Sequence, residues 1–597
     1  MANSPEELDA NVVSYEIKAD GTALPDSYNV LSVTIIKEVN KISTCEIVLT
    51  DGDPANEDFP VSEASTLVPG VEIEVLLGYD QENTSIFKGI VLKQSISTSS
   101  DSGTDTKVEV TAKDKAVKMT VGRKNAYYVK KKDSDIMSTL IGNSGASADV
   151  SSTSKEWDEL IQYYATDWDF LISRAEFNGM LVTTDAGTVS VKAPSDASDC
   201  GLEVTYGDDL YEFEGTIDAT DQFSSVECSA WDYTSQAIVS GSASITDSGQ
   251  GNLTSSTLAD VLGLSSYEMQ SPGPMESDSL ETWAKAQISK SKYAKIQGKA
   301  TFQGNASPLP GTTISLQGMG DRYNGTAFIS GVTHNFHGGD WVTEVNLGSS
   351  AEWFSEKVQM QAPLAAGRLP GIDGLYTGTV KQIDSDEKGE FRVLVEIPLI
   401  QTGTDGVWAR MATFYATNNA GCFFYPETGD EVVVSFLNND PSFPIILGSL
   451  YNSSSKASPY TPDDTNSTKA FVTNAQIKIE FDDENKVLTI TTPGKNQMIY
   501  SDEDESITIK DQNSNSIEMS SSGITIKSAS DMTIKAAQSI SIEAGTTLDM
   551  KGSSSASLSS TSISVKADAD VTVEGSASAK FSSSGTNTIK GAMVMIN

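Results

Sequence analysis

The fold is decided by a repetitive stretch near the end of the chain, which reads GITIKSASDMTIKAAQSISIEAGTTLDM over residues 523–550. Two apolar residues stand two positions apart, and in this stretch such a pair returns every eight residues. Similar pairs precede the stretch and follow it. The period of eight runs from 524 to 556, one interval of seven leads to Ile563/Val565, and the period of eight then resumes. The full series is Ile507/Ile509, Ile517/Met519, Ile524/Ile526, Met532/Ile534, Ile540/Ile542, Leu548/Met550, Ala556/Leu558, Ile563/Val565, Val571/Val573 and Ala579/Phe581.

Each pair indicates one short strand, because residues i and i+2 of a strand point to the same face. The Ser, Ala, Gly and Asp residues between the pairs suit tight corners. One such strand cannot bury its own apolar face, so the repeats must stack. About fifteen strands at a spacing of ~4.8 Å would give a rod on the order of 70 Å long.

Two architectures fit this repeat. In a single-chain β-helix, three consecutive strands would form one coil. In an intertwined triple-stranded β-helix, three chains would each supply one side of a prism, which leaves no lateral sheet edge exposed. In the trimer, the shared core is expected to contain Ile524, Ile526, Met532, Ile534, Ile540, Ile542, Leu548, Met550, Val571 and Val573.

Composition narrows the possible functions. The 597 residues carry a formal net charge of −41, which disfavours binding to nucleic acid or to anionic lipid. The four cysteines lie far apart without a CxxC pair, which is typical of ordinary thiols in a reduced compartment. The sequence has no apolar run long enough to span a bilayer and no visible secretory signal, so we expect assembly in the cytoplasm.

The rest of the chain is predicted to be mainly β, with a few helices. Alternating strands are expected from residue 12 to about 121, and helices over Asp133–Ile141, Asp167–Asn178 and Ser279–Ser289, with Asp167 as a cap and Gly142 and Gly179 as stops. Composition shifts predict a flexible N-terminus (1–10), a hub (11–350), a linker (351–372), an OB-fold domain (373–452), a second linker (453–469) and a needle (470–597).

The sequence offers little for catalysis. His334 and His337 are the only histidines, and two imidazoles without a convincing third ligand are a weak metal signal, so we expect a structural role. No GxSxG elbow is present, and no Ser or Cys nucleophile has a recognisable base nearby in sequence. We therefore predict no catalytic residue, no cofactor and no metal.

Three segments resemble the VgrG family, the spike of type VI secretion, and its relatives in extracellular contractile injection particles and contractile phage tails. Residues 162–171, QYYATDWDFL, are similar to the start of a family helix. Residues 407–410, VWAR, followed by 424–451, are similar to the family's OB barrel, and residues 589–597, IKGAMVMIN, are similar to its needle terminus.

The resemblance implies a non-enzymatic, homotrimeric spike with a phage-hub-like β-barrel head, an OB-fold neck and a triple β-helix needle. The hub would meet a hexameric inner-tube protein and baseplate subunits. A PAAR-repeat protein would cover a tip formed by Met593, Val594, Met595, Ile596 and Asn597. Sheath contraction would then eject the spike into a target cell or the medium, together with effectors, and the spike would contact membranes only transiently.

Two other functions remain open at this point. A polysaccharide-active enzyme built on a single-chain β-helix should show aromatic and acidic residues along its rod, but the tail has almost no aromatics. A receptor-binding tail fibre or adhesin should end in a globular, aromatic-rich head, whereas this sequence ends in small residues and methionines.

Overall fold

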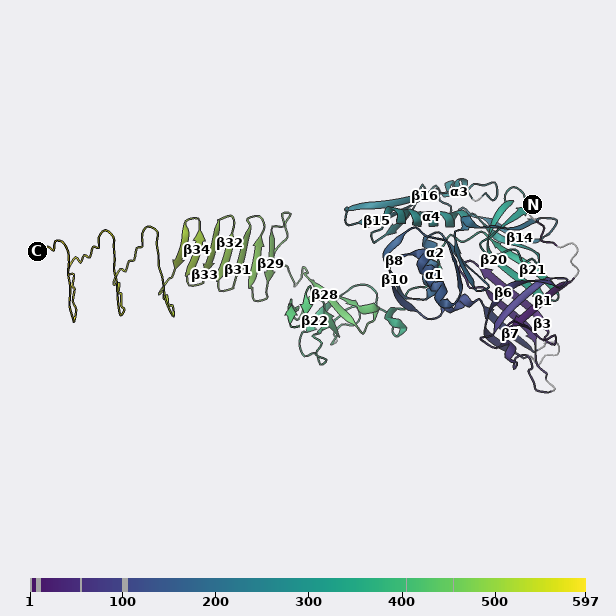
Figure 1. The fold of residues 1–597 in the computed structure, drawn as a ribbon, viewed down its shortest axis with the longest axis horizontal. Helices are drawn as coiled ribbons and strands as arrows, with labels where there is room; N and C mark the ends of the chain where they lie inside the picture. The colour runs from purple at the N-terminus through teal and green to yellow at the C-terminus, as the bar shows by residue number, and fades with distance from the viewer. Residues whose placement is uncertain are drawn as a thin grey trace. The chain divides into compact units, whose positions relative to one another are not determined.

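The computed structural model describes residues 3–6, 12–53, 56–98, 106–247, 249–403, 405–454 and 456–596. Most of the predicted N-terminal segment 1–10 therefore lies outside the described residues. The chain divides into two units, residues 1–450 and 451–597, and each is described by itself. Strands are the main regular element of both units, so the predicted mainly β fold class is confirmed (Figure 1). No helix among the described residues is long and apolar enough to cross a membrane.

The first unit contains a large mixed sheet that joins segments far apart in sequence. Strand β3 pairs antiparallel with β4 on one side and with β20, about 300 residues later, on the other. The strands of this sheet are β1 (Val13–Ala19), β2 (Thr22–Ala23), β3 (Val30–Glu38), β4 (Thr44–Thr50), β5 (Glu72–Tyr79), β6 (Glu82–Ser97), β7 (Lys107–Lys113), β13 (Asp199–Thr205), β14 (Leu210–Ile217), β18 (Ile296–Gln303), β19 (Thr313–Gln317), β20 (Gly325–His337) and β21 (Asp340–Leu347).

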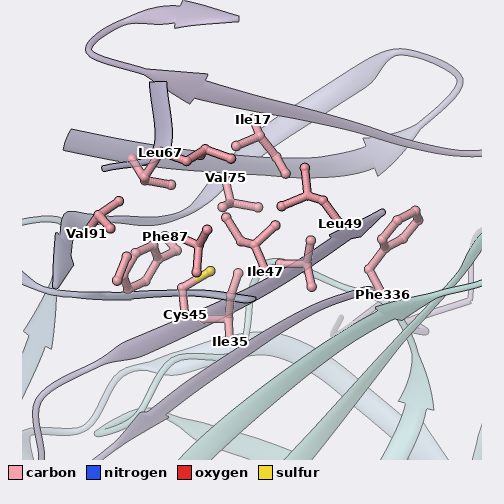
Figure 2. Close-up of a cluster of buried hydrophobic side chains, with 14 of the residues drawn as sticks. Ile17, Ile35, Cys45, Ile47, Leu49, Leu67, Val75, Phe87, Val91 and Phe336 are labelled. Atoms are coloured by element: carbon pink, nitrogen blue, oxygen red, sulfur yellow. The ribbon is translucent and has the colours of Figure 1, made fainter. Parts of the chain in front are cut away.

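The alternating apolar residues of β1 and β3–β7 meet in one core. Figure 2 shows side chains of Ile35, Ile47 and Val75 converging there, and all three are fully buried. Cys45 lies in the same cluster, and burial raises the pKa of its thiol far above the ordinary range. The alternating pattern of these strands thus places one face of each in a core that closes within a single chain.

The helices cover smaller sheets of the hub. The helices are α1 (Asp133–Ser144), α2 (Asp167–Phe177), α3 (Ser255–Leu262), α4 (Ser277–Ala294) and the single turn α5 (Phe354–Lys357). The small sheets consist of β8 (Lys124–Lys132) with β10 (Glu156–Ala165), of β9 (Ser147–Val150) with β11 (Leu181–Asp185) and β12 (Thr188–Lys192), and of β15 (Ser225–Asp232) with β16 (Ala237–Ser244) and β17 (Tyr267–Ser271). The three predicted helices therefore exist.

Two helix ends differ from the prediction. Gly142 lies inside α1, because the helix continues until Gly145 adopts the left-handed conformation that ends it. Asp167 is the first residue of α2 and does not cap it. The cap is Thr166, whose hydroxyl accepts the Asp169 N–H at 3.0 Å. Thr and Asp are both common capping residues, so the sequence pattern does not show whether Thr166 or Asp167 caps α2.

Five strands close a small barrel at the end of the first unit. They are β22 (Tyr376–Gln382), β23 (Val393–Glu396), β24 (Val407–Met411), β27 (Glu431–Phe436) and β28 (Pro444–Leu450). A short hairpin of β25 (Ala416–Thr417) and β26 (Ala420–Gly421) extends from it. The interior is filled by Val380, Val393, Val395, Ala409, Val432, Val434 and Ile446. The predicted OB-type barrel is thus present.

The second unit begins with an antiparallel meander of seven strands (Figure 1). The strands are β29 (Thr468–Val472), β30 (Lys478–Asp482), β31 (Val487–Thr491), β32 (Gln497–Ser501), β33 (Ser506–Lys510), β34 (Ser516–Ser520) and β35 (Gly523–Lys527). Residues 528–596 contain no strand. We expected one strand for every apolar pair. Within one chain the last pair that lies in a strand is Ile524/Ile526, because the backbone of the later pairs is not paired with another strand.

Candidate functional site

The seven-stranded sheet has one apolar face whose side chains are half-buried or exposed within the described part of the chain. Two columns of side chains cross it from strand to strand, as the pairing register shows. One column contains Phe481, Leu488, Tyr500, Ile507, Met519 and Ile524, and the other contains Phe471, Ile479, Ile490, Met498, Ile509, Ile517 and Ile526. We call this surface the apolar ladder. The opposite face is mostly polar at its central positions, with Glu480, Thr489, Thr508, Glu518 and Thr525.

A groove of about 620 Å³ runs along part of the apolar ladder. Its lining includes Ile490, Met498, Ile509 and Ile526, and Met532 of the segment that follows. A two-faced sheet of this kind is stable when another layer covers its apolar face. The apolar ladder therefore offers a surface on which a further layer can pack.

The segment that follows, residues 528–596, leaves its apolar pairs even more exposed. Ile534 is 69% exposed and Met550 is 73% exposed. All ten residues predicted for the trimer core are exposed in the single chain: Ile524, Ile526, Met532, Ile534, Ile540, Ile542, Leu548, Met550, Val571 and Val573. Strand pairing 24 residues apart, which a single-chain β-helix requires, does not occur in this segment. One chain therefore provides no core here.

The predicted tip residues form an exposed apolar run. Met593, Met595 and Ile596 are 78%, 79% and 88% exposed, and Val594 is also exposed. Asn597 lies outside the described residues. Isolated exposed apolar side chains are ordinary, but four in succession make a contiguous patch of the kind that marks a binding surface.

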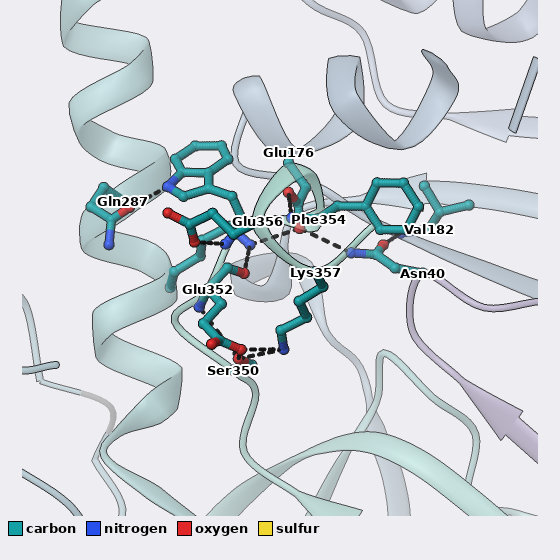
Figure 3. A network of polar contacts seen from close by, with 11 residues as sticks. Asn40, Glu176, Val182, Gln287, Ser350, Glu352, Phe354, Glu356 and Lys357 are labelled. Carbon is teal, nitrogen blue, oxygen red and sulfur yellow. Dashed lines mark hydrogen bonds and ion pairs between the residues drawn. The ribbon is translucent and has the colours of Figure 1, made fainter. Parts of the chain in front are cut away.

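A cluster of hydrogen bonds holds residues 350–358, which we call the exit segment, against the rest of the hub. Glu176 of α2 lies at the centre of this cluster and is 3% exposed. Figure 3 shows the Glu176 carboxylate between Asn40 and Phe354. It accepts hydrogen bonds from the Phe354 N–H at 2.7 Å, from Lys290 Nζ at 2.7 Å and from Asn40 Nδ2 at 3.2 Å.

Further contacts fix the exit segment to helix α4. Lys290 Nζ also donates to the Glu352 carbonyl at 3.0 Å, and the Trp353 indole donates to Gln287 Oε1 at 2.6 Å. The rings of Trp353 and Phe354 pack against two different hub cores. The first residues of the predicted linker 351–372 are thus bound to the hub by charge-assisted hydrogen bonds and by packing.

Sequence patterns did not reveal this clamp around Glu176. Its partners Asn40 and Phe354 lie 136 and 178 residues away in the chain. No local spacing rule connects such positions. The only available signal was a glutamate on the apolar side of a predicted helix, next to Ala175 and Phe177.

The residues of the 162–171 motif support the hub core. Trp168 is 5% exposed within the core formed by α1 and α2. The buried Asp167 carboxylate accepts a hydrogen bond from Gln162 Nε2 at 3.0 Å and pairs with Lys124. Packing and hydrogen bonding account for Trp168 and Asp167, whereas Tyr163 of the same motif is 68% exposed.

The two histidines do not form a site. His334 is fully buried, and its Nδ1 lies 3.0 Å from Thr343 Oγ1. Burial, with a smaller contribution from Lys37, lowers its pKa to about 3. His337 is exposed, and its Nδ1 lies 3.2 Å from the Leu31 carbonyl. No group of three or more His, Cys, Asp or Glu side chains suited to a metal occurs in the described part of the chain.

Known proteins share parts of this architecture. The family model of the Alg8 N-terminal domain matches residues 9–338, more than half of the chain. The model of the type VI secretion system/phage-baseplate injector OB domain matches residues 376–451, which coincide with the closed barrel. The type VI secretion system spike protein VgrG3 of Vibrio cholerae is 35% identical over 103 residues, which make up 16% of this chain and 10% of that protein.

Two further likenesses are weaker. The actin cross-linking toxin VgrG1 of Vibrio cholerae is 32% identical over 99 residues, 15% of this chain and 9% of that protein. The chain thus spans about a tenth of the length of these relatives. An Escherichia coli component of the type VI secretion system has a TM-score of 0.39 at 15% identity, covering 73% of this chain and all of that one.

A TM-score below 0.5 does not establish a shared fold. The family of this chain is therefore assigned from the two family models and from the closed barrel. The matches to VgrG spike proteins confirm the resemblance expected from the sequence motifs. The chain belongs to the family defined by the Alg8 N-terminal domain, and its barrel is an injector-type OB domain.

Proposed function

We propose that this protein is the non-enzymatic, homotrimeric spike of a bacterial contractile injection machine. The observation that carries the proposal is the uncovered apolar surface of the second unit: the apolar ladder, and the exposed pairs of residues 528–596. Three copies placed around one axis would cover each other's ladders and would give the later pairs the strand partners that they lack. The injector-type OB domain supports the same assignment.

In this spike, the hub joins the inner-tube protein and the baseplate, the OB barrel forms the neck, and residues 470–597 form the needle. The machine assembles in the cytoplasm, and contraction ejects the spike. Energy for penetration comes from the sheath, so the spike contributes stiffness and needs no reacting group. Effectors travel as partners of the spike, and the protein itself uses no cofactor.

The first test is the solution mass of the purified chain, measured by light scattering after size exclusion. We expect about 190 kDa, three times the 63.5 kDa of one chain, with the hydrodynamics of an elongated particle. A well-folded monomer of 63.5 kDa would overturn the proposal. The measurement needs no partner protein and no functional injection machine.

The tip has its own test. We propose that a PAAR-repeat protein covers Met593, Val594, Met595, Ile596 and Asn597. Met595→Asp should abolish capture of a purified PAAR-repeat protein, because it places a charge in an apolar contact. Thr586→Asp, in the same segment but outside the apolar run, should leave capture unchanged. Equal capture by both variants would reject the tip contact and leave the trimer proposal standing.

A further inference from the structure

The two lateral edges of the seven-stranded sheet carry opposite charges. Because the strands alternate in direction, the turns β30–β31 and β32–β33 lie at one edge, and the turns β29–β30, β31–β32 and β33–β34 lie at the other. We call the first the acidic edge, which carries Asp482, Asp483, Glu484, Asp502, Glu503, Asp504 and Glu505, with the lysines Lys469 and Lys486. We call the second the basic edge, which carries Lys478, Lys495, Lys510 and Lys527 with Asp511 as its one acid.

The charges of the acidic edge are mostly uncompensated within the chain. Asp483 pairs with Lys469, and the Asp482 carboxylate accepts backbone N–H groups of its own turn. The four consecutive acids 502–505 are all exposed. Clustered like charges repel one another, so an isolated chain gains nothing from placing them together.

The lysines of the basic edge also lack a carboxylate partner among the described residues. Lys495, Lys510 and Lys527 are exposed, and none of them forms an ion pair with a described residue. The Nζ of Lys478 lies over the ring of Tyr460, 5.5 Å from the ring centroid. The single acid, Asp511, accepts hydrogen bonds from the N–H groups of Asn513 and Asn515 and so holds its own turn.

A three-fold ring of identical chains must be closed by heterologous contacts, in which one edge of a copy meets the other edge of the next copy. Rotation about the axis does not shift a chain along it, so groups at the same level of the strand stack meet. The acids 482–484 follow β30, and Lys478 and Lys495 flank β30 and β31. The acids 502–505 lie between β32 and β33, and so between the levels of Lys495 and Lys510.

We propose that the acidic edge of each copy docks against the basic edge of the next copy, forming three identical charged seams around the apolar ladder. This inference rests on the proposed trimeric function and adds the edges that meet and their relative height. The seams also act against the wrong assembly. Docking of two copies through like edges, acidic against acidic or basic against basic, is disfavoured by like-charge repulsion.

The seam can be tested by cross-linking in the full-length chain. In the double variant Lys495→Cys with Glu503→Cys, a short thiol-to-thiol cross-linker should join chains into a three-chain species on a denaturing gel. Each single variant should give no such species, because its cysteine faces no cysteine of the neighbour. The unsubstituted chain controls for its own four cysteines.

Charge reversal gives an independent measurement. Lys495→Glu with Lys510→Glu should lower the yield of trimer on refolding roughly tenfold, as six weak ion-pair sites turn repulsive. Adding Glu503→Lys and Glu505→Lys should restore the yield to within about twofold, since each position then has an opposite charge again. Helix content and the melting of the hub report whether the variants still fold.

The outcomes separate the two proposals. A monomeric wild-type chain would overturn the proposed function and the seam together. A wild-type trimer in which the double-cysteine variant fails to cross-link, or in which charge reversal has no effect, would overturn the seam alone. Dimers formed by a single-cysteine variant would show that like edges meet, which also overturns it.

Discussion

The hub and the second unit use the same kind of strand in opposite ways. In the hub, the apolar faces of strands such as β3 and β4 meet in a core that closes within one chain, where Ile35 and Ile47 are fully buried. In the second unit, the strands expose an equally apolar face, and Ile524 and Ile526 of β35 remain open to solvent. An alternating pattern shows that a face must be buried, but it does not show which chain buries it.

This difference has a measurable consequence. Stability that arises inside one chain does not depend on protein concentration, whereas stability that arises between chains does. The hub should therefore melt at the same temperature at every concentration. The needle should form only where copies meet. The following substitutions sharpen or break this contrast, from the largest expected effect to the smallest.

The largest effect is expected for Ile534→Lys in the needle. In a trimer it would place three unpaired ammonium groups in one apolar layer, at a cost of roughly 5 kcal/mol or more per trimer. The neighbouring variant Thr533→Lys should tolerate the charge, because in the proposed trimer residue 533 stands between the core residues Met532 and Ile534 and faces the opposite side of the strand. Thermal unfolding of both variants is the measurement. Equal melting of Ile534→Lys and wild type would exclude a shared core.

In the hub, the largest effect is expected for Glu176→Gln. The substitution keeps the shape of the side chain but leaves the mostly buried Lys290 without its counter-charge, and we expect a loss of about 3 kcal/mol. Limited proteolysis should also cut the exit segment (350–358) faster. Glu281→Gln, which removes an exposed partner of Lys285, should cost less than about 0.5 kcal/mol. Equal losses of stability in Glu176→Gln and Glu281→Gln would show that burial does not strengthen the contacts of Glu176.

His334 should make the stability of the hub depend on pH. Its pKa of about 3 in the folded protein lies below the ordinary 6.5, so between these values only the unfolded chain takes up the proton. Stability should fall as the pH drops below about 6.5, by up to about 1.4 kcal/mol per pH unit. The slope should diminish in His334→Gln and persist in His337→Gln. Identical slopes in both variants would assign the dependence to carboxylates.

The smallest effect concerns the cap of α2. Thr166→Ala removes the hydroxyl that accepts the Asp169 N–H and should lower hub stability by about 1 kcal/mol. Thr139→Ala, an exposed position in α1 whose hydroxyl bonds only to the Asp135 carbonyl, should have almost no effect. Chemical denaturation compares the two. A larger loss for Thr139→Ala would contradict the cap assignment.

The sequence predicted those parts of the fold that depend on local rules. Periodicity and turn residues located α1 and α2, and the spacing of β22–β28 indicated a small barrel. Helix ends were less certain, because Gly142 fits a helix stop as well as Gly145 does. The meander β29–β35 was predicted only in part, since strands that hold Phe471 or Leu488 depart from the eight-residue repeat.

The arrangements that depend on distant contacts could not be predicted. Glu176 meets Phe354 only because α2 and the exit segment (350–358) pack on the same side of the hub. The charged edges of the sheet become visible only when the strand directions are known, because Lys495 and Glu503 are close in sequence but lie at opposite edges. Local spacing carries no information on either juxtaposition.

The spacing of the apolar pairs also affects whether a newly synthesised chain stays soluble before it assembles with other copies. In residues 528–590, large apolar side chains occur singly or in pairs, always interrupted by Ser, Thr, Asp, Ala or Gly. Aggregation-prone segments usually need five to seven consecutive residues of high hydrophobicity, so this segment should stay in solution while it waits. The run Met593–Ile596 is the exception. When this chain is overproduced without its partners, aggregation should begin at this run.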